Sequence, residues 1–252
     1  IEYRDNDYKI ILVINKKNQI INFINFRTKK SYLPCDIVIM AGGKGSRLMP
    51  LTKNTPKPLI KVGSKAIIEH NIDRLRSFGV ENYWISLNYL ANQVMEYFGN
   101  GQSKYIKINY VIEETPLGTI GAISKINNFN NDYVLITNSD ILTNLDYEKF
   151  FLDFLQTNAD FSVVTIPYNV KIPYAVVEIK ENIITGFEEK PTYTYYSNAG
   201  IYLAKRSILK YIPNDLFFNA TDLIEKLIKL NKKIISYSFS GYWLDIGKHE
   251  DL

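Results

Sequence analysis

The feature that most constrains the fold of this chain is an apolar run followed directly by a glycine-rich loop. The segment DIVIMA (36–41) is short and almost continuously apolar, which is typical of a strand buried on both faces of a sheet. Gly42, Gly43 and Gly45 follow at once. Open α/β sheets bind ligands at the carboxyl ends of their strands, and glycines there let backbone N–H groups approach anionic oxygens. An α/β sheet with an anion-binding loop is therefore predicted.

The pattern between residues 36 and 156 supports this class. Short apolar runs alternate there with segments of helical period. Strands separated by helices imply right-handed βαβ crossovers and a Rossmann-like, mostly parallel sheet flanked by helices. We expect strands at 36–41, 83–87, 105–112 and 133–137, and helices at 66–78, 90–98, 119–126 and 146–156.

After residue 160 the chain becomes rich in strands. Turns containing Pro, Asn and Gly separate short apolar segments, as in antiparallel structure. A parallel nucleotide-binding half followed by an antiparallel acceptor-binding half suits an enzyme that joins two substrates. We expect strands at 161–166, 175–179, 183–189, 197–204, 234–239 and 242–247, with a helix at 221–230.

Residues 1–33 form a separate, small unit in this interpretation. An apolar segment at 10–14, a polar turn and a second apolar segment at 19–26 predict a β-hairpin. A two-stranded hairpin is marginally stable alone. It must therefore pack on a segment that precedes or follows it, or on a second copy, and a homo-oligomer stays open.

Composition excludes several functional classes. The net charge is +4, from 30 basic and 26 acidic residues in mixed order, which is too weak for a nucleic-acid footprint. No aliphatic run approaches the roughly 18 residues of a membrane span, and the mixed-charge N-terminus lacks the pattern of a signal peptide. The single cysteine, Cys35, cannot form an internal disulfide and favours a reducing, cytoplasmic location.

The glycine loop does not match the two commonest phosphate-binding motifs. Leu48 stands where a G-x-G-x-x-G fingerprint needs glycine, and no Walker A string occurs. The loop instead carries Arg47, and Lys57 follows between Pro56 and Pro58. Two prolines restrict the backbone on either side of the lysine, so its amine is expected to project from a stiff loop.

The stretch GGKGSRLMPLTKNTPKP (42–58) resembles the signature of sugar-1-phosphate nucleotidyltransferases, a family that includes glucose-1-phosphate thymidylyltransferases and mannose-1-phosphate guanylyltransferases. The resemblance runs over 36–252. Residues 1–33 resemble the last part of a CBS regulatory domain, which some members carry. The other motifs, in order, are PLGTIGA (116–122), NSD (138–140), FEEKP (187–191), NAGIY (198–202) and WLDIG (243–247).

This resemblance implies a reaction in which the phosphate of a sugar 1-phosphate attacks the α-phosphorus of a nucleoside triphosphate and releases pyrophosphate. Two anions must meet, so the site has to supply positive charge and orientation. Arg47 and Lys57 are the implied catalytic residues. Asp140 and Asp245 are the implied ligands of Mg²⁺, which prefers carboxylate oxygens.

The remaining implied contacts divide between the two substrates. The nucleotide is expected on Ala41, Gly42, Gly43, Gly45, Ser46, Glu113 and Gly118. The sugar phosphate is expected on Ala175, Glu189, Lys190 and Asn198. Related sequences often have glycine where Ala175 stands. The added methyl group would narrow the pocket if the backbone N–H there contacts the sugar, so the identity of the sugar stays open.

Glu113 gives an expectation for the base. In thymidylyl and uridylyl members a glutamine stands five residues before the glycine equivalent to Gly118, whereas here the residue is Glu113. A carboxylate only accepts hydrogen bonds, and guanine presents two adjacent N–H donors. We therefore expect GTP as donor. The resemblance implies an amino-hexose or hexose 1-phosphate such as glucosamine 1-phosphate as acceptor, because CBS-bearing members of the family include guanylyltransferases of that kind. UTP, dTTP or CTP remain alternatives if Glu113 faces solvent and the backbone reads the base.

Two other functions stay open. A catalytically silent regulatory or scaffolding subunit could share the fold, because fold does not guarantee activity. A metal-dependent glycosyltransferase would be expected to carry an Asp-x-Asp motif, whereas Ser139-Asp140-Ile141 offers one aspartate. Release of pyrophosphate in the presence of a sugar 1-phosphate and Mg²⁺ separates the three.

Overall fold

The computed structural model describes residues 6–252. The main sheet consists of β3 (Cys35–Met40), β6 (Asn82–Leu87), β7 (Lys107–Ile112), β8 (Tyr133–Asn138), β10 (Phe161–Lys171), β13 (Thr192–Lys205) and β14 (Ile234–Ser238). The α-helices are α2 (Ile67–Ser77), α3 (Ala91–Phe98), α4 (Tyr147–Thr157) and α5 (Ala220–Lys229). Two-stranded pairs are β1 (Ile10–Ile14) with β2 (Ile20–Asn25), β4 (Lys61–Val62) with β5 (Lys65–Ala66), β9 (Ile141–Thr143) with β15 (Trp243–Asp245), and β11 (Val176–Lys180) with β12 (Ile183–Glu188).

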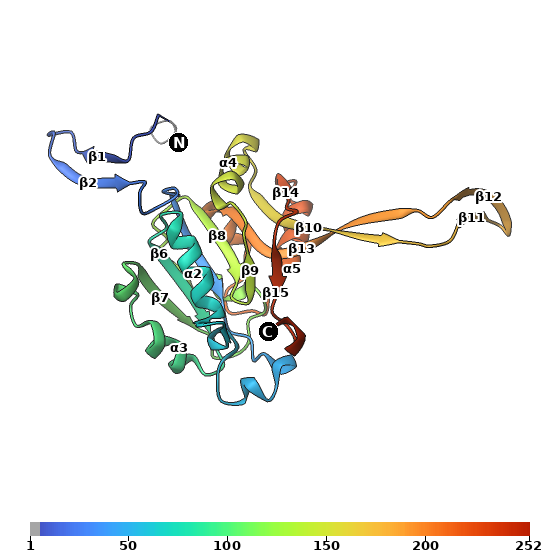
Figure 1. Ribbon diagram of the computed structural model, residues 1–252, viewed down its shortest axis with the longest axis horizontal. Helices are drawn as coiled ribbons and strands as arrows, with labels where there is room; N and C mark the ends of the chain where they lie inside the picture. Colours follow the sequence, from blue (N-terminus) through green and yellow to red (C-terminus); the bar gives the residue numbers. More distant parts are fainter. Residues whose placement is uncertain (1–5) are drawn as a thin grey trace.

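The seven strands of the main sheet lie in the order β14-β10-β13-β8-β3-β6-β7 (Figure 1). β8, β3, β6 and β7 are parallel, and β10 is parallel to β14. β13 runs against both of its neighbours, β8 and β10. The predicted α/β class, with a mostly parallel sheet flanked by helices, is therefore confirmed.

The central strand β3 is buried along its whole length, as its apolar run predicts. Ile37 and Ile39 pack in the core shared with α2, α3 and α4. Val38 and Met40 point to the opposite core, which α5 helps to close. Because alternate residues of a strand face opposite sides, only a continuously apolar strand satisfies both cores, and the glycine loop begins where this strand ends.

One predicted helix is corrected. Residues 119–126 do not form an α-helix; a short 3-10 helix covers Gly121–Lys125 instead. The segment follows Gly118, whose φ is +79°, and the N–H of Ile120 bonds to the Phe218 carbonyl at 3.2 Å rather than within a helix. Two glycines in four residues also lower the helix propensity.

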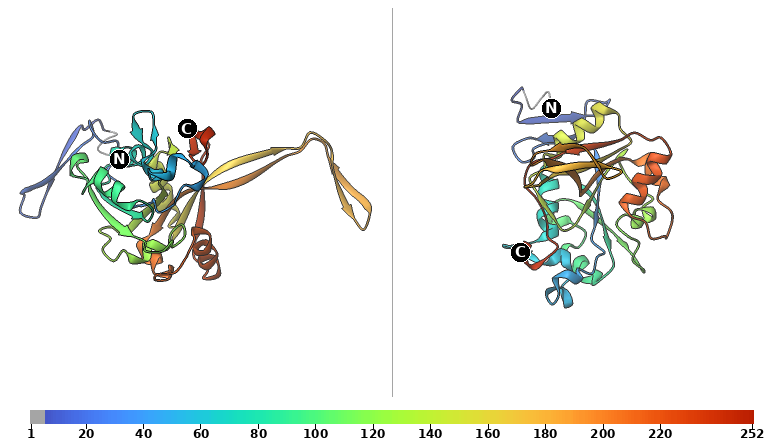
Figure 2. Two further views of the ribbon diagram at one scale, coloured as in Figure 1. Left: turned by 90° about the horizontal axis from the view of Figure 1, so that it is seen from below. Right: turned by 90° about the vertical axis from the view of Figure 1, so that its right-hand side faces the viewer.

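β10 and β13 are longer than predicted and continue beyond the sheet as a two-stranded ribbon, which the hairpin β11–β12 extends. We call residues 166–197 the arm. It projects far from the body of the protein (Figures 1 and 2). The antiparallel structure predicted after residue 160 is therefore divided between the main sheet, where β13 runs against β8 and β10, and this protruding arm.

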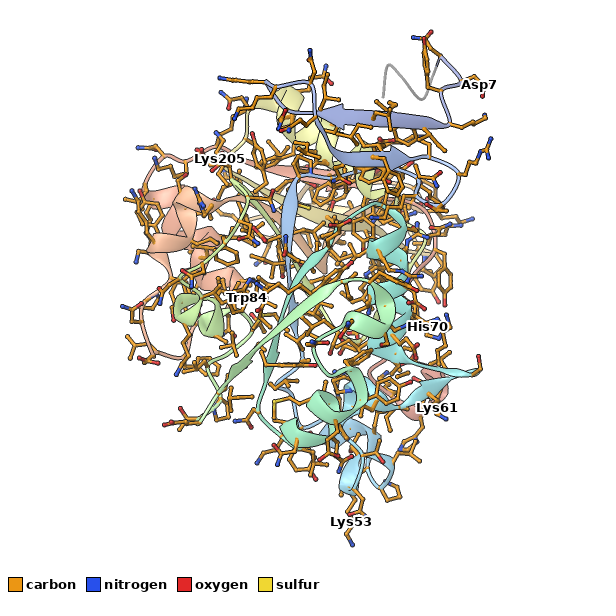
Figure 3. The ribbon with its side chains drawn as sticks, turned by 90° about the vertical axis from the view of Figure 1, so that its left-hand side faces the viewer. Asp7, Lys53, Lys61, His70, Trp84 and Lys205 are labelled. Carbon is orange, nitrogen blue, oxygen red and sulfur yellow. The ribbon has the colours of Figure 1, made fainter. Side chains whose placement is uncertain are left out.

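The hairpin β1–β2 is present as predicted and lies at the amino end of β3. Figure 3 shows Asp7, near this hairpin, and Lys53, in the loop region after β3, at opposite ends of the body. Residues 1–5 of the predicted 1–33 unit lie outside the described residues, and the CBS-like character of that unit stays a prediction. Within residues 6–252, no helix combines the length and apolarity that crossing a membrane requires.

Candidate active site

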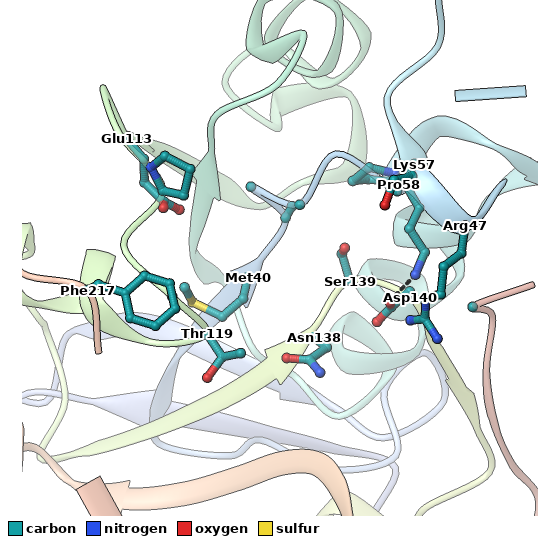
Figure 4. Close-up of a pocket in the computed structure, with 18 residues that line it drawn as sticks. Met40, Arg47, Lys57, Pro58, Glu113, Thr119, Asn138, Ser139, Asp140 and Phe217 are labelled. Carbon is teal, nitrogen blue, oxygen red and sulfur yellow. Dashed lines mark hydrogen bonds and ion pairs between the residues drawn. The ribbon is translucent and has the colours of Figure 1, made fainter. Parts of the chain in front are cut away.

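A pocket of about 380 Å³ opens at the carboxyl end of the parallel strands, where the α/β class places its ligands. It is formed by the glycine loop together with segments that follow β7 and β8. The predicted site residues among its lining are Ala41, Gly42, Gly43, Gly45, Ser46, Arg47, Lys57, Glu113, Gly118 and Asp140. Figure 4 shows that Arg47, Lys57 and Asp140 gather at one end of this pocket, whereas Glu113 and Phe217 lie at the other.

The glycine loop is shaped by close packing against Lys57. Gly45 has a φ of +64°, and a Cβ atom at this position would lie 2.8 Å from the Lys57 Cβ. The Thr52 hydroxyl donates to the Gly45 carbonyl at 2.9 Å. Only glycine combines this left-handed backbone with so close an approach, which explains how the loop and the lysine occupy the same small volume.

Lys57 and Asp140 form an ion pair at the charged end of the pocket. Both side chains are largely buried, with 10% and 19% of their surface exposed. Asp140 is positioned by its neighbour Ser139, whose N–H bonds to the Met40 carbonyl at 3.0 Å and whose carbonyl accepts from the buried amide of Asn71 at 3.0 Å. The aspartate is thus anchored to β3 and α2 at once.

Arg47 extends into the same region. A Cβ atom on Gly247 would lie 3.1 Å from both terminal nitrogens of the guanidinium, so the glycine of WLDIG leaves the space that Arg47 fills. The guanidinium lies beside Asp140 and Lys57 (Figure 4). Two cations and a carboxylate therefore meet next to the backbone of the glycine loop, an arrangement suited to binding phosphate.

Asp245 is brought next to Asp140 by the pairing of β9 with β15. It lies opposite Ile141, and the N–H of Ile246 bonds to the Asp140 carbonyl at 2.9 Å. Burial raises the pKa of the Asp245 carboxyl, and the nearby charge of Asp140 raises it further, with Lys57 and Arg47 acting in the opposite direction. Each of two carboxylates at close range disfavours the charged form of the other.

The donor set of this pair fits Mg²⁺. In residues 6–252 no group of three or more His, Cys, Asp or Glu side chains is arranged for a metal ion. Mg²⁺ does not need such a cage, because it commonly binds one or two carboxylates together with water and substrate phosphates. Asp140 and Asp245 therefore suit a metal that arrives with its phosphate ligand.

Glu113 lies at the other end of the pocket, directly after β7. Its side chain is buried and does not face solvent. One carboxylate oxygen accepts the N–H of Leu117 at 2.9 Å, and the other accepts the hydroxyl of Ser86. These two bonds hold the carboxylate in a fixed orientation at the pocket wall.

A second cavity of about 180 Å³ adjoins the first and shares Asn138 with it. Asn198 and Asp245 line this cavity together with Trp243. The Asn198 amide donates to the Tyr202 hydroxyl at 2.9 Å and accepts the N–H of Gly200 at 2.9 Å. Asn198 and Asp245 are therefore close to the main pocket, although they come from the last part of the chain.

Three predicted sugar-phosphate residues are not brought to either cavity. Ala175, Glu189 and Lys190 lie on the arm and are exposed. The side chains of Glu189 and Lys190 expose 63% and 68% of their surface, and their charged atoms are 3.9 Å apart. Their role in binding sugar phosphate stays a prediction.

The pocket residues to which the sequence interpretation gave no role include Thr119, Asn138, Ser139 and Phe217. The first three lie inside the motifs PLGTIGA and NSD, so the motifs themselves carried the signal. Phe217 belongs to no motif. It enters the pocket because the loop before α5 bonds back to the loop after β7, through the N–H of Phe218 and the Leu117 carbonyl at 2.9 Å.

The mostly parallel sheet, the glycine loop and the cluster of cations and carboxylates define an α/β protein built to bind phosphorylated ligands. The chain belongs to the nucleotidyl transferase family, whose model matches residues 36–252. The predicted family is thereby confirmed.

Known proteins of several specificities are similar to this chain. It is 30% identical over 229 residues to the bifunctional protein GlmU of Methanococcus maripaludis, and 30% identical over 223 residues to a mannose-1-phosphate guanylyltransferase of Mycobacterium tuberculosis. These matches cover 86% of this chain, which spans 52% and 62% of the two relatives.

Solved structures show the same fold. A Bacillus anthracis protein described as a glucose-1-phosphate thymidylyltransferase, in complex with sucrose, matches with a TM-score of 0.68 and 26% identity, over 86% of this chain and 92% of that one. HddC from Yersinia pseudotuberculosis complexed with GMP-PN matches with a TM-score of 0.65 and 27% identity, over 86% and 96%.

Proposed function

We propose that this protein transfers a nucleotidyl group from a nucleoside triphosphate to a sugar 1-phosphate and releases pyrophosphate. The observation that carries the proposal is the meeting of Arg47, the Lys57–Asp140 pair and Asp245 beside the glycine loop. The family match adds the reaction class. The two substrates are both polyanions, and this end of the pocket offers the charges and backbone donors that they need.

The chemistry requires no general base. A phosphate monoester has a second pKa near 6, so the attacking oxygen is mostly ionised at neutral pH. Neither histidine lines the pocket: His70 and His249 bond to the carbonyls of Val62 and Met49 at 2.9 and 2.8 Å. Lys57 would reduce the repulsion between the two phosphates, and the planar fork of Arg47 would hold two oxygens as charge develops.

Asp140 and Asp245 would hold Mg²⁺ in this reaction. The ion supplies neutralisation of the triphosphate and orientation of its oxygens. The protein's part is to hold the two carboxylates side by side through the β9–β15 pairing.

We further infer that the donor is GTP. Each Glu113 oxygen already accepts one hydrogen bond from the protein and keeps a lone pair for a second. The N1–H and exocyclic amine of guanine can use both oxygens, whereas uracil and thymine would place carbonyl oxygens against a buried charge. The exposed ring of Phe217 lies on the same side of the pocket (Figure 4) and offers a surface for the base.

The acceptor proposed is a hexose or amino-hexose 1-phosphate such as glucosamine 1-phosphate. The cavity beside Asp245, with the amide of Asn198 in its wall, adjoins the phosphate end of the pocket and suits hydroxyl groups. This choice depends on the resemblance to CBS-bearing relatives.

Pyrophosphate release tests the proposal. The purified protein is incubated with Mg²⁺ and each pair from GTP, UTP, dTTP and CTP against several sugar 1-phosphates, and Arg47→Ala is the control. Release that needs both substrates and is fastest with GTP supports the proposal. No release with any pair from a folded protein would favour the silent subunit, and breakdown of an added nucleotide sugar without pyrophosphate would favour a glycosyltransferase.

A further inference from the structure

Ser86 is a buried polar residue in an apolar part of the main sheet. It lies in β6 opposite Met40 of β3 and Val111 of β7, and residues in register on neighbouring strands point to the same side. Met40 and Val111 belong to the core that α5 helps to close. A hydroxyl group in such a place is costly unless it has a hydrogen-bond partner. Ser86 is 1% exposed, and its hydroxyl donates to Oε1 of Glu113.

The backbone of Glu113 is held without the Ser86 side chain. The Glu113 N–H donates to the Leu87 carbonyl at 2.8 Å, and the amide of Asn88 donates to the Glu113 carbonyl at 2.6 Å. These two bonds fix the point from which the side chain extends. They do not fix how the carboxylate is turned, because the last torsion of a glutamate side chain is broad and roughly two-fold.

Three contacts determine the orientation of the carboxylate. The Ser86 hydroxyl donates to Oε1, and the N–H of Leu117 donates to Oε2 at 2.9 Å. A Cβ atom on Gly42 would lie 2.7 Å from Oε1, so the first glycine of the loop leaves the space that this oxygen occupies. Glu113 lines the pocket, and Ser86 lies behind it. Ser86 therefore acts on the pocket wall through Glu113.

We propose that Ser86 is a positioning residue for recognition of the base: its hydroxyl turns the Glu113 carboxylate so that both oxygens meet the N1–H and the exocyclic amine of guanine. This inference rests on the proposed function, in which Glu113 binds the base. A contact that uses two parallel hydrogen bonds depends on the angle between the two groups. The preference for guanine over a purine without the exocyclic amine therefore depends on a residue that does not touch the nucleotide.

The main chain of Ser86 makes a second contact, which a side-chain substitution retains. The Ser86 carbonyl accepts the N–H of Ala41 at 2.9 Å, immediately before the glycine loop. Replacing the side chain removes the hydroxyl and keeps the loop attached to β6. Binding of the triphosphate should therefore persist in such a variant, and its base preference can be measured separately.

The test compares the binding of GTP and ITP, whose base lacks the exocyclic amine of guanine. Dissociation constants are measured by calorimetry with Mg²⁺ and without a sugar phosphate, so the measurement needs no activity. The unmodified protein should bind GTP about ten-fold or more tightly than ITP, because ITP leaves one carboxylate oxygen without its donor. In Ser86→Ala this ratio should fall to about three-fold or less, because a carboxylate held at one oxygen can turn.

Ser162→Ala is the matched control. Ser162 is fully buried in β10 of the same sheet, and its hydroxyl has no hydrogen-bond partner within residues 6–252. This variant should keep the ratio of the unmodified protein. Ser86→Cys is the second variant if Ser86→Ala does not fold, as judged by circular dichroism. Its thiol is a weak donor, so its ratio should lie between those of the unmodified protein and Ser86→Ala.

A double-mutant cycle with Glu113→Gln shows whether Ser86 acts through Glu113. The glutamine variant lacks the pair of acceptors, so adding Ser86→Ala should change its ratio little, whereas independent sites would give additive effects. Additive effects, an unchanged ratio in Ser86→Ala or Ser86→Cys, an equal loss in Ser162→Ala, or equal binding of GTP and ITP by the unmodified protein would overturn the inference. Selective binding of GTP that depends on Ser86, in a protein that releases no pyrophosphate with any sugar 1-phosphate, would reject the proposed reaction and support the role of Ser86.

Discussion

Lys57 and Asp140 are 83 residues apart in sequence and form an ion pair in the pocket. The lysine comes from the stiff loop after β3, and the aspartate from the turn after β8, the strand beside it. Removing one member of a buried pair leaves the other charge uncompensated. Lys57 and Asp140 therefore contribute both to the stability of the fold and to the proposed reaction. Substitutions of neighbouring residues are expected to change one of these properties without the other.

Arg47→Ala should lower turnover about 100-fold or more, because it deletes one preorganised group that stabilises developing charge. The melting temperature should change little, since the guanidinium lies at the pocket surface rather than in a core. Lys53→Ala removes an exposed cation from the neighbouring loop and serves as the control. Near-normal turnover of Arg47→Ala in steady-state kinetics would refute the assigned role.

Asp140→Asn and Asp245→Asn should both remove Mg²⁺-dependent activity but differ in stability. Asp140→Asn leaves Lys57 without its partner and should lower the free energy of unfolding by about 1–3 kcal/mol. The raised pKa of Asp245 means that its charged form is disfavoured in the folded state, so Asp245→Asn should leave stability at pH 7 unchanged or higher.

Chemical denaturation of the two aspartate variants, followed side by side with activity at several Mg²⁺ concentrations, checks this difference. Equal losses of stability would contradict the geometry of the pair. Full activity with an unchanged Mg²⁺ requirement in either variant would remove that residue from the metal site.

Glu113→Gln should shift the donor preference from GTP toward UTP and dTTP while keeping the fold. The amide oxygen can still accept the N–H of Leu117, and the Ser86 hydroxyl can reverse and accept from the new amine. Rates with each triphosphate at fixed acceptor are the measurement, and Glu114→Gln, at an exposed neighbouring carboxylate, is the control. Equal or better turnover of the unmodified protein with UTP or dTTP would reject guanine recognition by Glu113.

Asp36 should make stability depend on pH. It is fully buried at the amino part of β3, and one of its oxygens has no hydrogen-bond partner within residues 6–252. Burial raises the pKa of this carboxyl, so the folded state binds the proton more tightly than the unfolded state. The free energy of unfolding should therefore rise as pH falls from neutral toward the ordinary carboxyl range, by about 1.4 kcal/mol for each tenfold difference in proton affinity between the two states.

Asp36→Asn should lose this contribution, whereas Glu96→Gln, which changes an exposed carboxylate, should keep it. Denaturant titrations between neutral and mildly acidic pH measure the difference between the two variants. A pH dependence that is identical in Asp36→Asn and the unmodified chain would show that Asp36 does not carry it.

Local sequence was sufficient to specify the strand β3, the glycine loop and the position of Lys57, because each depends on neighbours close in the chain. A continuously apolar run fits only a strand buried on both faces, and glycines at its end admit a left-handed turn that other residues avoid. The family motifs added Asp140, Asn198 and Asp245 to the candidate site residues. An α-helix was predicted over 119–126, but Gly121–Lys125 form a 3-10 helix. The local sequence does not reveal this, because the backbone at Ile120 bonds to the distant loop at Phe218.

The three-dimensional arrangement was needed to establish which of these groups meet. The Lys57–Asp140 pair, the closeness of Asp140 to Asp245 and the entry of Phe217 into the pocket depend on strand order and loop packing across long stretches of chain. The arm is the clearest case. Its residues alternate like those of any half-buried hairpin, but only continuous pairing of β10 with β13 holds Glu189 and Lys190 away from the body. The alternation of side chains specifies which face of a strand is apolar, whereas the geometry of the whole sheet determines where in the molecule that face lies.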